Sequence, residues 1–252
     1  MMPRIFVHES VEENGVLTID GHNGHHFARV LRANEGEELV VAAMNGPFLG
    51  KIKRVDSKQG ILDIEIKSAY PPHEPTCKII LIQGLAKGDK MDTILQKCTE
   101  VGVSTIICYE ARRSVVSIKS KEGQKIERFH RIALEAAGQA QRDIVPIIQY
   151  AESVKTLKSL LEAESVNSLI LLDEAEHDIG LNQVLTESNA SSASVIAIAV
   201  GPEGGWDDDE RKAFHSLLNG VSVTLGSRIL RTETAGVVAA AVVLYHLSQL
   251  GV

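Results

Sequence analysis

The sequence predicts an α/β protein of two domains, a small β domain over residues 1–70 and a larger domain with a mainly parallel sheet over residues 77–252. Short apolar runs separated by turn signals fill the first part, whereas strands alternate with longer helical patterns in the second. Between them lies a proline cluster that cannot continue either regular structure, so we expect a linker over residues 71–76.

Several short strands are expected in the first domain. Turn signals such as Asn14-Gly15 and Asn45-Gly46-Pro47 separate them, because glycine and asparagine tolerate positive φ. Residues 62–67 alternate strictly between apolar and polar, as a strand with one solvent-facing side does. A helical insert is expected over residues 25–32. The expected strands cover residues 4–7, 15–19, 38–42, 48–55 and 61–66.

Five strands are also expected in the second domain, and all are apolar throughout, which is typical of strands covered on both faces. Apolar residues at helical spacing predict helices near residues 91–101 and 126–136. The last helix, from about residue 233 to 249, is apolar on nearly every side, so the sheet or another subunit must bury it. The expected strands cover residues 78–83, 105–109, 168–173, 195–200 and 221–225.

The net charge of -7 taken alone argues against a nucleic-acid partner. The charge is uneven, however, because residues 76–145 hold 12 basic and 8 acidic side chains. A basic face can therefore exist on an acidic protein, and scattered solvated charges are the alternative. With no apolar run of roughly 18 residues and no signal peptide, we expect a soluble cytoplasmic protein. Cys77, Cys98 and Cys108 lack the spacing of a disulfide framework or zinc site, so we expect buried apolar side chains and no metal.

Two loops remain as candidate binding segments, because the usual dinucleotide, P-loop, zinc-protease and hydrolase signatures are absent from the sequence. The loop at 200–206 has three glycines within five residues, which lets backbone approach a ligand closely. The segment 225–235 leads from a strand into the last helix and carries two arginines three residues apart. Ligands of open α/β sheets bind at such strand ends, and the apolar side chains here suit an adenine ring.

Each of these features also has a purely structural interpretation. The glycines are compatible with a simple tight turn, and the acidic run 207–210 is typical of the first turn of a helix. Thr232 is a suitable N-cap for the last helix, and Glu233 is well placed near its positive end. Glu233 therefore has two possible roles, one structural and one catalytic.

At these loops the chain resembles the ribosomal RNA small subunit methyltransferase E family of the SPOUT superfamily, over essentially its whole length. The resemblance is specific because five segments occur in the same order, although each alone is weak. These segments are 26–32, 97–103, 135–142 ahead of Val145-Pro146, 201–205 and 225–235.

The resemblance implies a PUA-like β-barrel domain that helps bind RNA, followed by a SPOUT α/β domain with a C-terminal trefoil knot. It also implies a homodimer that uses S-adenosylmethionine to methylate N3 of uracil 1498 in 16S RNA on the small ribosomal subunit. The residues expected to bind the methyl donor are Leu172, Val200, Gly201, Pro202, Glu203, Gly204, Gly205, Leu225, Gly226, Ile229, Leu230 and Thr232.

Methylation at N3 of uridine requires loss of a proton and stabilisation of the negative charge that spreads toward O2 and O4. Arg228 or Arg231 is the candidate for this stabilisation, because a guanidinium stays cationic and offers several fixed donors. Glu233 is the candidate base if a protein group takes the proton.

RNA contacts are expected from basic residues in both domains, although Arg142 has the alternative of pairing with an acid or closing a helix. Two other function classes are a non-catalytic RNA-binding assembly factor and a nucleotide-using metabolic enzyme on a doubly wound sheet. The missing phosphate-binding signatures argue against the second. The candidate RNA-binding residues are Arg4, His26, Arg29, Arg32, Lys87, Arg112, Arg113 and Arg142.

Overall fold

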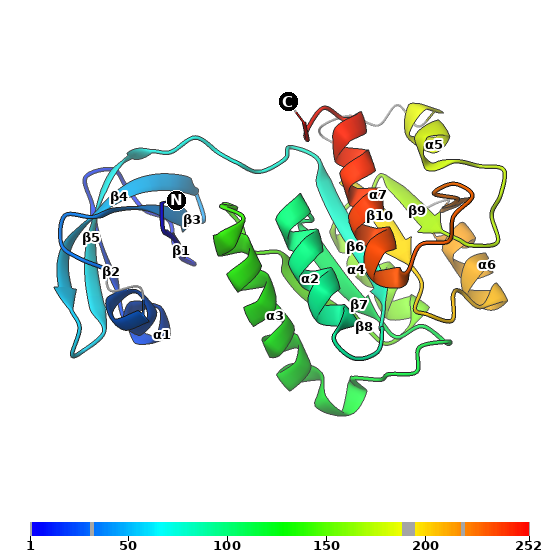
Figure 1. Ribbon diagram of the computed structural model, residues 1–252, viewed down its shortest axis with the longest axis horizontal. Coiled ribbons are helices and arrows are strands. Elements are labelled where there is room, and N and C mark those ends of the chain that lie inside the picture. Colours follow the sequence, from blue (N-terminus) through cyan, green and yellow to red (C-terminus); the bar gives the residue numbers. More distant parts are fainter. Residues whose placement is uncertain (1, 31–32, 188–194, 218–219, 252) are drawn as a thin grey trace. The chain divides into compact units, whose positions relative to one another are not determined.

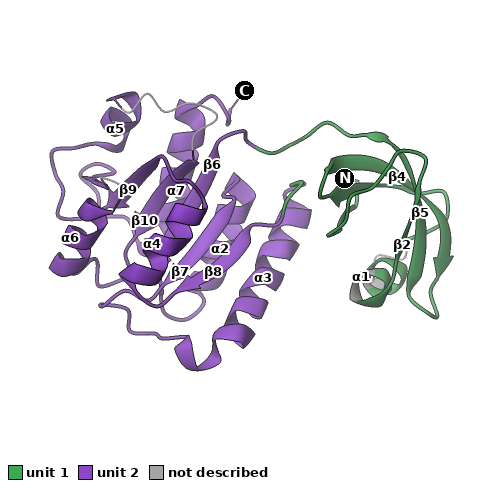
Figure 2. Ribbon diagram, turned by 180° about the vertical axis from the view of Figure 1, so that it is seen from behind, with its two compact units in different colours: residues 1–74, 141–144 green, residues 75–140, 145–252 purple. Residues whose placement is uncertain are grey.

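The computed structural model of the chain describes residues 2–30, 33–187, 195–217 and 220–251. It divides into two compact units (Figure 2). Unit 1 consists of residues 1–74 together with the short segment 141–144, and unit 2 consists of residues 75–140 and 145–252.

Unit 1 is built on a curled five-stranded sheet (Figure 1). Its strands are β1 (Arg4–Phe6), β2 (Val16–Ile19), β3 (Glu38–Ala43), β4 (Gly46–Asp56) and β5 (Ile61–Ala69), in the order β1-β3-β4-β5-β2. The alternation expected at residues 62–67 is confirmed: Leu62, Ile64 and Ile66 are buried, and the polar residues between them are not.

The helical insert of unit 1 begins earlier than expected, with α1 (Gly21–His25) followed by a π-helical turn (His26–Val30). The expected end of this insert, residues 31–32, lies outside the described residues. Phe27 on the turn is buried in the core of the sheet together with Ile19 and Leu62.

Unit 2 contains a six-stranded sheet in which every pairing is parallel, as the apolar strands predict. Two of the expected strands match the structure and the other three differ by one or two residues at one end. The edge strand β8 was not among the expected strands. The strands are β6 (Lys78–Gly84), β7 (Thr105–Tyr109), β8 (Ile147–Ala151), β9 (Ser168–Leu172), β10 (Val195–Val200) and β11 (Val221–Val223), in the order β11-β9-β10-β6-β7-β8.

Helices cover both faces of this sheet (Figures 1 and 2). One face packs against α2 (Lys90–Val101), α3 (Glu122–Gln139), α5 (Leu181–Glu187) and α7 (Thr232–His246). The other face packs against α4 (Val154–Ala163) and α6 (Asp208–Ser216). A short 3-10 turn at Lys119–Lys121 precedes α3.

Local sequence determines where α6 begins, whereas tertiary contacts affect the start of α7. Asp207 caps α6 through a capping box with Glu210, so the acidic run does begin a helix as predicted. The prediction of Thr232 as N-cap of α7 is wrong, because Arg231 holds that position and Thr232 is the first helical residue. Its hydroxyl is instead engaged by residues far away in the chain.

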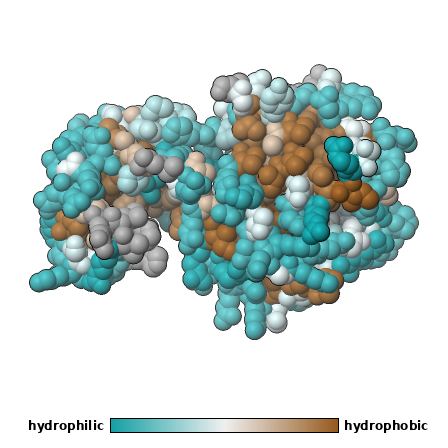
Figure 3. Space-filling model, viewed as in Figure 1, coloured by the Kyte–Doolittle hydropathy of each residue, from teal (hydrophilic) through white to brown (hydrophobic). Residues whose placement is uncertain are grey.

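The last helix, α7, has one buried face and one partly exposed apolar face. Ala239, Ala240 and Val243 are fully buried against the sheet, whereas Val238 and Val242 are only half-buried and Tyr245 is 71% exposed. Apolar surface gathers over this helix in Figure 3. The sheet therefore buries only part of its apolar side chains.

All three cysteines are free and buried, as expected. Burial raises the pKa of the Cys98 and Cys108 thiols to about 12 and that of Cys77 to about 11. No helix among the described residues is long and apolar enough to cross a membrane.

Candidate functional site

The carboxyl ends of three neighbouring strands lie at one level of the sheet. Leu172 at the end of β9 pairs in register with Val200 at the end of β10 and with Val223 at the end of β11. The loops that follow, at residues 173–180, 201–207 and 224–231, therefore start side by side although they are far apart in the chain. In parallel sheets this edge is where ligands bind.

These three loops enclose a cavity of about 570 Å³, within the range of about 300–1,000 Å³ typical of small-molecule sites. All twelve residues predicted to bind the donor line it, as do Arg228 and Arg231. Nine further lining residues were not predicted as donor-binding residues from the sequence, and several of them follow β9 directly. The missed residues are Lys90, Asp173, Glu174, Glu176, His177, Val223, Thr224, Ser227 and Ala235.

Glycines bring backbone segments close together around this cavity. A Cβ at Gly84 would lie 2.6 Å from the ring of Pro202, so only glycine lets β6 end against the loop after β10. Gly205 has a φ of +66°, and a Cβ there would overlap the carboxylate of Glu174. The glycines of this loop therefore do more than form a tight turn.

Thr232 connects three segments at the base of the cavity. Its hydroxyl donates to the carbonyl oxygen of Gly201 at 2.7 Å and accepts from the Gln83 side-chain amide at 2.8 Å. Gln83 is fully buried at the end of β6. The hydroxyl thus ties the start of α7 to the loop after β10.

The carboxylates on the wall of the cavity are mostly held by specific partners. Arg211 forms two bonds to Asp173, from Nε at 2.8 Å and Nη2 at 3.0 Å. Burial raises the pKa of Asp173, but these bonds outweigh it and hold the pKa below the usual value. Glu203 accepts from Lys90 Nζ at 2.9 Å and from the Lys87 backbone N–H at 3.0 Å.

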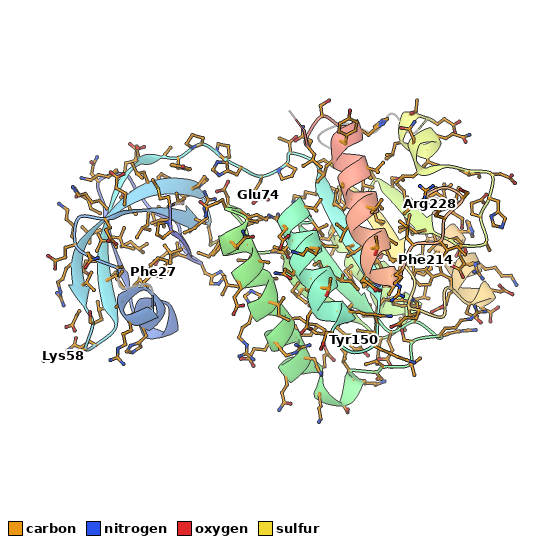
Figure 4. The ribbon with its side chains drawn as sticks, in the orientation of Figure 1. Phe27, Lys58, Glu74, Tyr150, Phe214 and Arg228 are labelled. Atoms are coloured by element: carbon orange, nitrogen blue, oxygen red, sulfur yellow. The ribbon has the colours of Figure 1, made fainter. Side chains whose placement is uncertain are left out.

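The loop before α7 presents two cations to the cavity. Arg228 (Figure 4) and Arg231 are both exposed, and neither has an acidic partner among the described residues. Glu233 does not line the cavity; its Oε2 lies 3.9 Å from Lys90 Nζ. This oxygen has no hydrogen-bond partner among the described residues, and the role of Glu233 as candidate base stays a prediction.

Two of the predicted RNA contacts are corrected because their side chains are buried in unit 1. The Arg4 side chain is fully buried and pairs with Asp143. The Arg142 side chain is 5% exposed and binds Glu74, with Nη2 to Oε2 at 2.5 Å. Both guanidiniums therefore hold unit 1 together and are not available on the surface.

The other basic residues lie in more open positions. Arg29 donates to the backbone oxygens of Ser57 and Lys58. Lys87 and Arg113 are exposed, and Arg113 donates to Gly204 O in the cavity loop at 3.2 Å.

Arg112 is exposed but already ion-paired, with Asp207 at 3.0 Å and with Asp209 at 2.6 Å. Two predicted RNA contacts cannot be placed: Arg32 lies outside the described residues, and the side chain of His26 is not described.

Comparisons with known families cover both units. A model for an RNA methyltransferase domain matches residues 72–244, and a model for an RNA methyltransferase PUA domain matches residues 19–65. The chain is 32% identical to ribosomal RNA small subunit methyltransferase E of Bacillus subtilis (strain 168), over 99% of this chain and 98% of the relative. It is 31% identical to the protein of the same name from Rickettsia conorii, over 94% and 93%.

Solved structures show the same likeness. A ribosomal RNA small subunit methyltransferase E from Neisseria gonorrhoeae, bound to S-adenosyl methionine, has a TM-score of 0.79 at 26% identity, over 97% of this chain and 98% of the other. A putative methyltransferase from Legionella pneumophila, in complex with the bound cofactor SAM, gives the same score, identity and coverage.

Proposed function

Because the chain belongs to the ribosomal RNA small subunit methyltransferase E family, we propose that it transfers a methyl group from S-adenosylmethionine to N3 of a uridine in 16S ribosomal RNA. Relatives that carry the family name, and two similar structures that contain this donor, support the activity and the donor. The choice of N3, and of uracil 1498 on the small subunit, rests on the family resemblance.

The single observation that carries the proposal is the cavity at the ends of β9, β10 and β11. Leu172, Val200, Val223 and Leu225 supply apolar walls suited to an adenine ring. When bound, the donor supplies an electrophilic methyl group on a positively charged sulfur. The residues present thus match the donor in size and chemistry.

Arg228 and Arg231 act on the uridine in this proposal. Their guanidiniums lie on the cavity wall and have no acidic partner among the described residues. Guanidiniums next to the reacting base lower the energy of negative charge on O2 and O4 as the N3 proton leaves. Lys87 and Arg113, next to the same loop, are placed to bind RNA phosphates.

We also propose that the active form is a homodimer and that the chain carries the trefoil knot of the SPOUT superfamily. The half-buried valines and exposed Tyr245 of α7 support the dimer, since a second copy would cover this apolar face. Sedimentation velocity checks this: wild type should be dimeric, and Val238→Glu with Val242→Glu should be monomeric. A wild-type monomer would exclude the dimer.

A methylation assay tests the activity. Purified protein, labelled donor and 30S subunits that lack the modification should yield one 3-methyluridine per subunit by mass spectrometry of digested RNA. Parallel reactions with naked 16S RNA identify the preferred substrate. Methylation of another base would overturn the N3 assignment, and no methylation of either substrate would overturn the enzymatic function.

The non-catalytic assembly factor remains as an alternative only if the cavity binds no donor. Such a protein would keep the basic surface and the PUA domain but would show no saturable affinity for S-adenosylmethionine. Calorimetry therefore separates the two functions without any RNA substrate.

A further inference from the structure

Glu174 differs from the other carboxylates that line the cavity. The side chain follows β9 directly and is 41% exposed. Its one ion pair among the described residues is a long contact to Arg211 Nη2, at 3.4 Å. Asp173, Glu176 and Glu203 are each held by two or more shorter bonds.

Glu174 shares its ion-pair partner with two other carboxylates. Arg211 also binds Asp173 and Asp208, so a single guanidinium faces three carboxylates. Among these, Asp173 holds the two short bonds from Nε and Nη2. Glu174 thus has the longest of the three contacts to Arg211, which leaves its carboxylate able to attract a cationic group in the cavity.

Gly205 keeps the space that this carboxylate occupies. A side chain at position 205 would collide with Glu174, and the φ of +66° disfavours any residue with a Cβ. Two loops thus cooperate at this point: one supplies the charge and the other leaves room for it.

We propose that Glu174 binds a positively charged group of S-adenosylmethionine and so selects the donor over uncharged adenosine compounds. This inference rests on the proposed function. The donor carries two cationic groups, an ammonium and a sulfonium, and either matches a carboxylate. Glu174 is therefore a specificity-determining residue that recognises charge, whereas the apolar walls recognise the adenine ring.

Calorimetry with matched ligands tests this role on the full-length protein. In Glu174→Gln the affinity for S-adenosylmethionine should fall about tenfold, as expected for loss of a charge-assisted contact at a partly exposed site. The affinity for 5′-methylthioadenosine, which has the adenosine but neither cation, should stay within about twofold. Glu162→Gln, which removes an exposed acid of α4 that does not line the cavity, should leave both affinities unchanged.

The outcomes separate the possibilities. An unchanged affinity for S-adenosylmethionine, or an equal loss for both ligands, would overturn the role of Glu174. With S-adenosylhomocysteine, a loss shared with the donor assigns the ammonium as the partner, and a loss confined to the donor assigns the sulfonium. A wild type that binds no donor would instead overturn the proposed function.

Discussion

Two pairs of arginines show how position decides the role of one residue type. Arg4 and Arg142 in unit 1 are buried, and each faces a carboxylate. Arg228 and Arg231 on the cavity loop are exposed and have no acidic partner among the described residues. The buried pair is committed to the fold, whereas the open pair is available for charge on a substrate. Basic composition alone does not distinguish these roles.

The strongest test of this contrast is removal of the open pair. Arg228→Ala with Arg231→Ala should lower the single-turnover methylation rate on 30S subunits by about 10²–10³-fold, because stabilisation of the developing negative charge is lost. The melting temperature should stay within about 2 °C of wild type, since neither side chain is buried. Lys158→Ala, an exposed cation of α4 outside the cavity, serves as the control and should retain the wild-type rate. A wild-type rate for this double variant would contradict the electrostatic role.

Removal of the carboxylate that pairs with a buried arginine should lower the stability of the fold. Asp143→Ala leaves the Arg4 guanidinium buried without its carboxylate, which costs about 3–5 kcal/mol of folding free energy. Urea unfolding followed by far-UV circular dichroism should show this loss. Fluorescence of Trp206, the single tryptophan and part of unit 2, should respond less.

A paired replacement provides the control for this burial effect. Arg4→Met with Asp143→Leu removes both charges and should lose much less stability than the single variant. Equal losses in the two variants, or a wild-type midpoint for Asp143→Ala, would show that the ion pair does not hold unit 1.

The sequence predicts most of the strands and two of the three cavity loops because their signals are local. Residues 105–109 and 195–200 are short apolar runs covered on both faces, and the structure places strands there. The edge strand β8 was missed because it has one exposed end residue, Ile147 at 53%, and polar interruptions.

The roles of the buried arginines were not predictable from local pattern. Asp143 lies 139 residues from Arg4, and Glu74 lies 68 residues from Arg142, so only the folded chain brings them together. The same holds for Thr232, whose partners in the sheet and cavity loop compete with the capping role that its type suggests. Long-range pairing explains each of these errors.

A smaller effect is expected where the hydroxyl of Thr232 supports the cavity. Thr232→Val keeps the side-chain shape but removes the bonds to Gln83 and Gly201, so the loop after β10 loses an anchor. Donor affinity measured by calorimetry should fall about fivefold. The control Thr186→Val, an exposed position of α5, should leave it unchanged. Wild-type affinity in Thr232→Val would show that this hydroxyl does not shape the site.

The smallest effect concerns pH. The pKa of Asp173 in the folded chain is held below the usual value. Its pair with Arg211 therefore stabilises the fold fully at pH values above the usual pKa of an unfolded Asp. This contribution is lost as the pH falls through the lower, folded pKa. The difference in unfolding free energy between wild type and Asp173→Asn should therefore be constant from about pH 8 to pH 5 and shrink below about pH 4. A difference that changes between pH 6 and 8 would point to another group.

The central claim is that the loops after β9, β10 and β11 hold a methyl donor, and titration calorimetry of the purified protein with S-adenosylmethionine tests it most directly. We predict saturable binding of one donor per chain, weakened in Thr232→Val and in Glu174→Gln. A folded protein that shows no heat of binding at saturating donor would contradict the claim.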